Sequence, residues 1–279
     1  MRLLNHIRTL ATTAGMLRQW IRWNLGWLGI HPYLKLPGGD KVSGFRNFSE
    51  FWSTRATAPG EDEVAFINRY AGKSGVLLDV GANLGCFSLT LARLRPDCMV
   101  HAFEPSPETL ILLQANIIRS RQINVNIHPF ALGREIDHLQ FVNDPSSPAT
   151  NRLVDREEAA SNLTIEVEVT TIDQFLKMKG TPNVAFMKID VEGFEADVLR
   201  GAALTLTHRG CHAGLIELCP NNLHRAGSSV ETILNVLSQA GWRLHFLYAD
   251  GSPGPIVTPS NAKKISVANV GMLAIEADG

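Results

Sequence analysis

The sequence has little of several features that mark common protein classes. Its four cysteines, Cys86, Cys98, Cys211 and Cys219, form no CxxC pair and no metal-finger spacing. No apolar stretch reaches the roughly 18 uninterrupted residues that a membrane-spanning helix needs, and no signal-peptide cleavage pattern is present. The formal net charge is −1, so a broad basic face for nucleic acid is not expected. These absences favour a cytoplasmic protein with reduced thiols that does not bind nucleic acid.

The first 39 residues are basic and contain no aspartate or glutamate. Their apolar residues recur at helical spacing up to Ile21, so we expect a basic amphipathic helix. Such a helix suits peripheral contact of residues 1–30 with an anionic membrane surface. It also suits packing against its own domain or against the second subunit of a homodimer, and packing is the favoured alternative. Because residues 31–40 are rich in turn formers, we assign residues 1–59 to an N-terminal helical extension and linker.

From Gly75 onward, short apolar runs alternate with helical stretches. Continuous apolar runs are typical of parallel strands buried on both faces. Their alternation with helices predicts a doubly wound α/β fold with a mostly parallel, seven-stranded sheet. The strands are expected at residues 75–80, 98–104, 123–132, 183–190, 213–218, 242–249 and 269–277. We assign residues 60–279 to this domain, which begins with a helix at about residues 60–71.

One region interrupts this alternation. Residues 163–169, LTIEVEV, alternate between apolar and polar as a half-exposed strand does, and residues 138–142 are expected to pair with them. The sequence therefore predicts an inserted β-hairpin with a mobile tip at about residues 144–161, followed by a short helix after Thr171. An insertion at this edge is expected to help cover a substrate.

A loop of small residues, DVGANLG, follows the first strand of the domain and opens a helix. Its candidate binding residues are Asp79, Gly81, Ala82, Asn83 and Gly85, because small residues at such a turn let the backbone approach a nucleotide. A nicotinamide-type GxGxxG would need glycine at positions 83 and 86, where asparagine and cysteine stand, and the GK[ST] of a P-loop is absent. The loop lacks the pattern of a diphosphate cradle, and a tight turn without a ligand is the alternative.

The next strand ends at Glu104, about twenty residues past this loop. A carboxylate at this point can accept hydrogen bonds from both ribose hydroxyls of a nucleoside. Pro105 would then flank the nucleoside, and Ala131 would lie near its base. The alternative is an exposed glutamate at the end of a strand.

Ionisable residues also gather where two later strands end. Lys188 and Asp190 share one strand face, Glu192 follows two residues later, and Glu217 ends the next strand. Ligands of open α/β sheets bind at this end of the sheet, so all four are candidate catalytic residues. A strand end followed by a capped helix is the alternative. No metal is assigned, although these carboxylates together with an asparagine could also hold a divalent cation.

Taken in order and spacing, the motifs DVGAN, FEP and KIDVEG resemble those of the FkbM-type methyltransferases, over roughly residues 60–249. The resemblance implies a Rossmann-like, class I methyltransferase fold and S-adenosylmethionine as the cofactor. It also implies transfer mostly to oxygen, often on a sugar, a glycan or a polyketide-like product. The residues it places along the cofactor are Asp79, Gly81, Asn83, Gly85 and Glu104, and those it places beside the transferred methyl group are Lys188, Asp190 and Glu192.

We therefore expect an S-adenosylmethionine-dependent O-methyltransferase with a small-molecule or glycan acceptor. Asp190 or Glu192 is the candidate base for the hydroxyl proton, although Asp190 is also a candidate cofactor contact. Lys188 would hold the acceptor or steady the carboxylates, and Glu217 would orient the acceptor hydroxyl. Two alternatives stay open: a nicotinamide-dependent oxidoreductase on a similar sheet, and a non-catalytic, membrane-associated protein that binds a cofactor.

Overall fold

The computed structural model describes residues 32–143, 152–154, 163–180, 183–208 and 211–275. The amphipathic helix expected in residues 1–30 and most of the expected hairpin tip lie outside these ranges. Within them, no helix is both long and apolar enough to cross a membrane. The four cysteines form no disulfide with one another.

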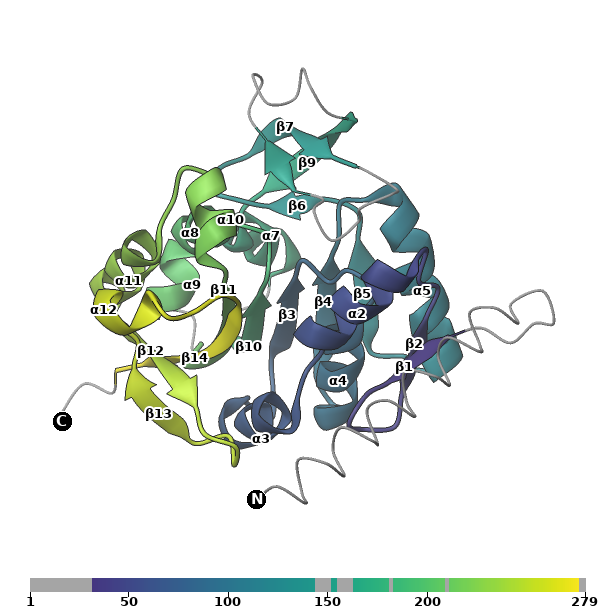
Figure 1. The fold of residues 1–279 in the computed structure, drawn as a ribbon, viewed down its shortest axis with the longest axis horizontal. Coiled ribbons are helices and arrows are strands. Elements are labelled where there is room, and N and C mark those ends of the chain that lie inside the picture. Colours follow the sequence, from purple (N-terminus) through teal and green to yellow (C-terminus); the bar gives the residue numbers. More distant parts are fainter. Residues whose placement is uncertain (1–31, 144–151, 155–162, 181–182, 209–210, 276–279) are drawn as a thin grey trace.

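A large sheet with the strand order β13-β12-β14-β11-β10-β3-β4-β5 forms the centre of the molecule (Figure 1). The five adjacent strands β11, β10, β3, β4 and β5 run parallel to one another. Strand β14 is antiparallel to both of its neighbours, and β13 is antiparallel to β12. The strands are β3 Val76–Val80, β4 Met99–Phe103, β5 Val125–His128, β10 Val184–Ile189, β11 Ala213–Leu218, β12 Trp242–Leu247, β13 Pro253–Ile256 and β14 Ala268–Ala274. All seven expected strands are present, so the doubly wound fold is confirmed; β13 adds an eighth strand at one edge.

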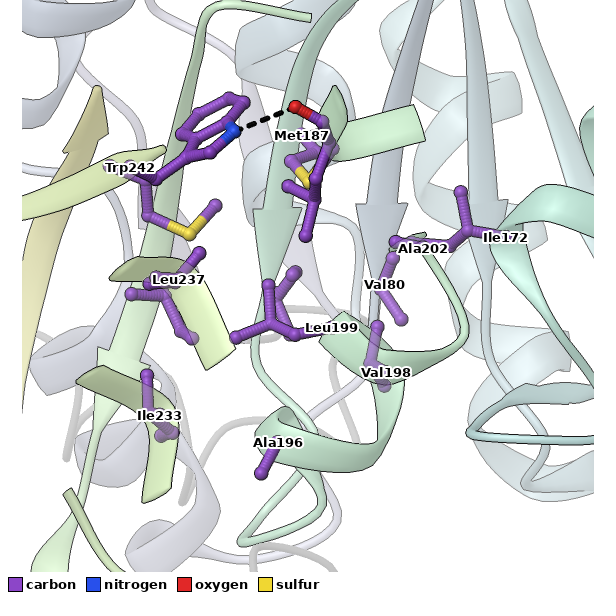
Figure 2. Packing of buried hydrophobic residues seen from close by; sticks show 14 of the residues in the cluster. Val80, Ile172, Met187, Ala196, Val198, Leu199, Ala202, Ile233, Leu237 and Trp242 are labelled. Carbon is purple, nitrogen blue, oxygen red and sulfur yellow. Dashed lines mark hydrogen bonds between the residues drawn. The ribbon is translucent and has the colours of Figure 1, made fainter. Parts of the chain in front are cut away.

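Helices cover both faces of this sheet, which explains why β3 is buried along its whole length. Leu77 points to one face, where it packs with helices α3 and α4, and the core continues from α4 to α5. Leu78 and Val80 point to the other face, against α7, α8, α9 and α11 (Figure 2). There Trp242 donates a hydrogen bond from its indole nitrogen to the carbonyl of Leu206 at 2.9 Å. The helices are α3 Glu61–Tyr70, α4 Cys86–Leu94, α5 Pro107–Ser120, α7 Ile172–Lys179, α8 Glu195–Arg200, α9 Ala203–His208, α10 Pro220–Arg225, α11 Val230–Gln239 and α12 Pro259–Ala262.

A second, smaller sheet has the order β6-β9-β7-β8 and lies beyond one end of the large sheet (Figure 1). Its strands are β6 Ala131–Leu132, β7 Asp137–Val142, β8 Leu153–Val154 and β9 Thr164–Thr170. The expected hairpin is confirmed, because β7 pairs antiparallel with β9, and the short helix expected after Thr171 is α7. The single strand expected at 123–132 is instead two strands, β5 and β6, in different sheets. Pro129 lies between them and has no backbone N–H to continue a ladder.

Residues 32–58 contain more regular structure than a linker does. Strands β1 Tyr33–Lys35 and β2 Lys41–Ser43 form an antiparallel hairpin, so the linker expected at 31–40 is wrong for its strand residues. Leu34, Leu36 and Val42 are buried in a core shared with α4 and α5. Helix α2, Phe48–Thr57, follows, with Asn47 as its N-cap. The domain boundary drawn at residue 59 stays a prediction about independent folding.

Candidate active site

A cavity lies at the carboxyl ends of β3, β4, β10 and β11, the end at which open α/β sheets bind ligands. Helix α2 and the small sheet contribute the remaining walls. Of the residues singled out in the sequence, those lining this cavity are Asp79, Gly81, Ala82, Asn83, Glu104, Pro105, Ala131, Lys188, Asp190, Glu192 and Glu217. Gly85 is not among the lining residues. The structure therefore brings the two groups of candidates, for the cofactor and for catalysis, into one cavity.

The loop after β3 requires glycine at position 81 because the chain at the end of β10 lies against it. Gly81 has a φ of 83°, and a Cβ at this position would lie 1.8 Å from the carbonyl oxygen of Asp190. The backbone N–H groups of Gly81 and Ala82 both donate to the carbonyl oxygen of Phe103, at 3.0 and 2.9 Å. The loop is thus pressed between the ends of β4 and β10, and only a residue without a side chain fits at its first position.

Two further residues of this loop have positive φ values just before helix α4 begins. Asn83 has a φ of 48°, in the left-handed region that asparagine tolerates better than most residues. Gly85, with a φ of 90°, is the N-cap of α4. Asp79, near the end of β3, is fully buried and accepts a hydrogen bond from the hydroxyl of Ser88 at 2.5 Å. Burial raises the pKa of Asp79 to about 6.

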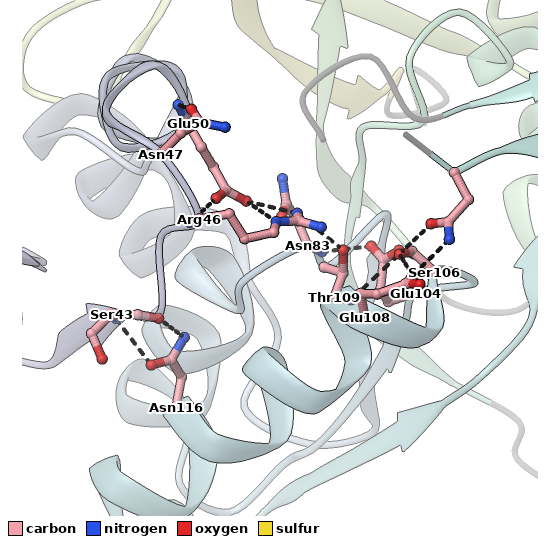
Figure 3. A network of polar contacts seen from close by, with 11 residues as sticks. Ser43, Arg46, Asn47, Glu50, Asn83, Glu104, Ser106, Glu108, Thr109 and Asn116 are labelled. Carbon is pink, nitrogen blue, oxygen red and sulfur yellow. Dashed lines mark hydrogen bonds and ion pairs between the residues drawn. The ribbon is translucent and has the colours of Figure 1, made fainter. Parts of the chain in front are cut away.

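Glu104 connects the loops that follow β3 and β4 (Figure 3). One carboxylate oxygen accepts from the backbone N–H of Asn83 at 3.0 Å, and the other accepts from that of Ser106 at 2.9 Å. Burial raises the pKa of Glu104 to about 7. Because each carboxylate oxygen has a second lone pair, Glu104 can still accept hydrogen bonds from a bound ligand.

Lys188 and Asp190 form an ion pair on the opposite side of the cavity. The Lys188 ammonium is completely buried, lies 3.2 Å from Oδ2 of Asp190, and donates to the carbonyl oxygen of Ile189 at 3.2 Å. It also lies over the ring of Phe87, 4.9 Å from the ring centre. Of the two roles considered for Lys188, steadying a carboxylate is the one that this geometry supports.

The loop that carries Asp190 and Glu192 is fixed by Glu195. One oxygen of the Glu195 carboxylate accepts from the backbone N–H groups of Val191 and Gly193, at 3.1 and 3.0 Å. Between them Glu192 has a φ of 55°, a strained conformation that persists only when its surroundings enforce it. Burial first, and the charge of Asp190 second, raise the pKa of Glu192 to about 8.

Glu217 completes a group of three carboxylates. It comes from β11, is 4% exposed, and lines the cavity. Ligand-capable oxygens of Asp190, Glu192 and Glu217 all lie within 4.8 Å of one another. Burial first, and then the charge of Asp190, raise the pKa of Glu217 to about 9. Three acidic groups this close together, one buried and two half-buried, are costly unless protons or a cation accompany them.

Several lining residues were not anticipated from the sequence. Helix α2 contributes four of them: Glu50, Ser53, Thr54 and Thr57. The one available signal was Asn47 with Glu50 three residues later, a pattern typical of a helix N-terminus. Phe141 and Leu153, from β7 and β8, also line the cavity, so the insertion forms part of its wall.

Comparison with known proteins points to one family. The family model for the methyltransferase FkbM domain matches residues 79–244. Methyltransferase 1 of Beauveria bassiana is 32% identical over 142 residues, which are 45% of this chain and 57% of that protein. Hexuronic acid methyltransferase AglP of Haloferax volcanii is 24% identical over 241 residues, which are 83% of this chain and 90% of that protein. The match to the first of these relatives thus spans little more than half of its length.

Among solved structures, an S-adenosylmethionine-dependent O-methyltransferase from Thermotoga maritima is 14% identical, with a TM-score of 0.44, over 88% of this chain and 78% of that chain. The fold rests on this chain's own strand order, and the family rests on the match, which covers more than half of the chain. The resemblance to the FkbM-type methyltransferases that the motifs indicated is thereby confirmed. The chain belongs to the FkbM methyltransferase family.

Proposed function

We propose that this chain transfers a methyl group from S-adenosylmethionine to a hydroxyl oxygen of a sugar, a glycan or a polyketide-like small molecule. The observation that carries the proposal is that one cavity is lined both by Glu104, with the loop after β3 that it contacts, and by Lys188, Asp190 and Glu192. A methyl donor held on the first side would present its methyl group toward the second. Such positioning supplies much of the rate of a displacement reaction.

The names of the relatives support an oxygen acceptor of this class. One is a hexuronic acid methyltransferase, another is the 2-O-methyltransferase NoeI of Sinorhizobium fredii, and a third is the 31-O-demethyl-FK506 methyltransferase FkbM of Streptomyces tacrolimicus. Because their acceptors differ from one another, the acceptor of this chain is proposed only as a class.

The residues around Glu104 fit the donor. Glu104 is buried, keeps free lone pairs, and lies beside the loop after β3, where Gly81 and Ala82 line the cavity with little or no side chain. Glu104 would accept hydrogen bonds from the ribose hydroxyls, Pro105 would flank the nucleoside, and Ala131 would lie near the base. Bound here, S-adenosylmethionine supplies a methyl group activated by the positive sulfur.

The ionisable residues would then handle the acceptor. As the hydroxyl oxygen forms its bond to the methyl carbon and the carbon–sulfur bond breaks, the hydroxyl proton must leave. Asp190 or Glu192 would accept it, while Lys188 steadies Asp190 and Glu217 orients the hydroxyl. Phe87, Phe141 and Leu153 provide apolar walls that exclude water.

The decisive experiment identifies a methylated product. Purified protein is incubated with isotopically labelled S-adenosylmethionine and fractions of small glycans and cell extract, and products that gain the label are sought by mass spectrometry. We expect a labelled hydroxyl-bearing product. Donor binding with no labelled product in any fraction would favour the non-catalytic alternative.

Variants then test the assignment of the base. Asp190→Asn and Glu192→Gln keep the shape of the side chain and remove its proton affinity, so we expect turnover to fall by about 10²–10⁴-fold while donor affinity changes little. Glu166→Gln, an exposed residue of β9 outside the cavity, is the control. Full turnover in both site variants would show that neither carboxylate is the base.

A further inference from the structure

We propose that Asp190, Glu192 and Glu217 form a binding site for a divalent cation of the Mg²⁺ or Mn²⁺ class. The three carboxylates come from the carboxyl ends of the neighbouring strands β10 and β11 and meet at the cavity wall. Hard divalent cations are bound by carboxylate oxygens of this kind. The proposal deepens the proposed function and rests on it for its purpose, because a hydroxyl bound to a cation ionises more readily.

Glu217 is the independent observation that points to a ligand. Its side chain is 4% exposed, and it faces the cavity. Among the described residues, no hydrogen-bond donor and no cation at ion-pair distance contacts its carboxylate. A carboxyl group in this state has lost most of its contact with bulk water without gaining a partner from the protein, and a cation entering from the cavity would supply that partner.

Lys188 does not take this role, although its ammonium is nearby. Its contacts are already directed to Oδ2 of Asp190, the carbonyl of Ile189 and the ring of Phe87. One lysine therefore contacts one of the three carboxyl groups, and Glu192 and Glu217 must be accompanied by protons or by a cation.

The other two carboxylates are oriented by neighbours that leave one oxygen available on each. Asp190 is held through Oδ2 by Lys188. Glu192 is held through Oε2 by the side-chain amide of Asn222, whose own oxygen accepts from Arg225 at 2.8 Å. Outer residues that hold one oxygen of a carboxylate in this way are typical of metal sites, where they fix the ligand before the ion arrives.

The strained backbone of Glu192 agrees with such a preformed arrangement. Its positive φ is maintained by the two hydrogen bonds that Val191 and Gly193 donate to Glu195. A simple capped turn would not require a glutamate in this conformation. The conformation brings an oxygen of the Glu192 carboxyl group within 4.8 Å of one from Glu217.

Binding of Mn²⁺ alone, measured by loss of the free-ion EPR signal, tests the proposal without any catalytic assay. With the full chain and no methyl donor present, we expect one bound Mn²⁺ per chain and displacement by excess Mg²⁺. Glu217→Gln and Asp190→Asn should each weaken binding at least tenfold, whereas Glu166→Gln, remote and exposed, should bind as the wild type does.

A second measurement keeps the test valid if a variant is altered in stability. Mg²⁺ should raise the melting temperature of the wild type and of Glu166→Gln, by preferential binding to the folded state, and should not raise that of Glu217→Gln. Absence of saturable Mn²⁺ binding in the donor-free wild type would overturn the proposal, as would equal binding by Glu217→Gln. Methyl transfer that persists in EDTA would support the proposed function and would show that the cation is not needed for it.

Discussion

Glu104 joins two loops of the site and is also a candidate contact for the donor. Its two oxygens join Asn83 and Ser106, and thereby the loops after β3 and β4. The same carboxylate is the candidate ribose contact. The position of Glu104 was predictable because an acid at the end of the second strand is a local sequence feature. Its two backbone partners were not predictable, because they depend on how the loops fold over each other.

Replacing Glu104 by glutamine should weaken the donor and flatten the pH dependence of stability. Its folded-state pKa, about 7, is raised by burial above the usual value, so its contribution to stability is fully present below about pH 4.5 and is lost as pH rises through about 7. In the donor-free protein this loss is about 1–3 kcal/mol of unfolding free energy. Glutamine does not titrate, so the variant should not show this loss. Donor affinity should fall by about 1.5–3 kcal/mol.

Urea unfolding at pH 5 and pH 8, together with calorimetric titration of the donor, measures both effects. The comparison of interest is the change in unfolding free energy between the two pH values, because glutamine also leaves one of the two backbone N–H groups without its acceptor at either pH. An identical pH dependence in wild type and variant would show that Glu104 is not a titrating buried group.

The close approach of Gly81 to the backbone of Asp190 leads to a separate prediction. Alanine at this position would meet the carbonyl oxygen of Asp190 at 1.8 Å and would also have to adopt a positive φ. We expect Gly81→Ala to destabilise the fold by at least about 2 kcal/mol. Gly180→Ala is the matched control: its φ is also positive, at 61°, but nothing lies within 4 Å of the added Cβ, so about 1 kcal/mol is expected there. Equal losses of unfolding free energy in the two variants, measured with urea, would mean that the loop in Gly81→Ala moves away from Asp190.

At the scale of elements, the strands of the large sheet were predictable and the cover of the cavity was not. A run such as VLLDV is buried on both faces, so its apolar continuity is visible in the sequence. Helix α2 has no such signature, because its sequence FSEFWSTRAT has no continuous apolar stripe. It is held instead by contacts with distant parts of the chain: Phe51 lies in the core shared with α4 and α5, and Glu50 pairs with Arg46, which approaches Thr109. The division between β5 and β6 was missed because the apolar pattern continues across Pro129.

Helix α2 should matter to the donor as well as to stability. Asn47 caps it by accepting from the backbone N–H of Glu50 at 2.8 Å, and Ser229 caps α11 by accepting from that of Thr232 at 3.1 Å. Asn47→Ala and Ser229→Ala should each cost about 1 kcal/mol in unfolding free energy. Because α2 lines the cavity and α11 does not, Asn47→Ala alone should weaken donor affinity, by about fivefold. Equal donor affinity in the two variants would remove α2 from the donor site.

At the scale of the whole molecule, the order of the strands decides where the site lies. The chain runs outward from β3 to β4 and β5, then returns to place β10 on the other side of β3 before continuing to β11. The helices that follow β3 and β10, α4 and α8, therefore lie on opposite faces of the sheet, and open sheets form their binding crevice at such a switch in direction. The contact between Gly81 and Asp190 lies at this point. The sequence predicted the crevice because it predicted the order of elements, whereas the close approach of the two loops depends on their packing in the folded molecule.

A ligand bound across this crevice contacts loops from both halves of the sheet, so it should stabilise the molecule as a whole. S-adenosylmethionine at about one hundred times its dissociation constant should add about 2.7 kcal/mol to the unfolding free energy. For a chain of this length that corresponds to a rise of about 5–10 °C in melting temperature. NAD should produce no rise, because the DVGANLG loop lacks the glycine spacing that a dinucleotide requires. Glu104→Gln should need more donor for the same rise, and Glu166→Gln should not. An equal rise with NAD would contradict the assignment of the cavity to a methyl donor.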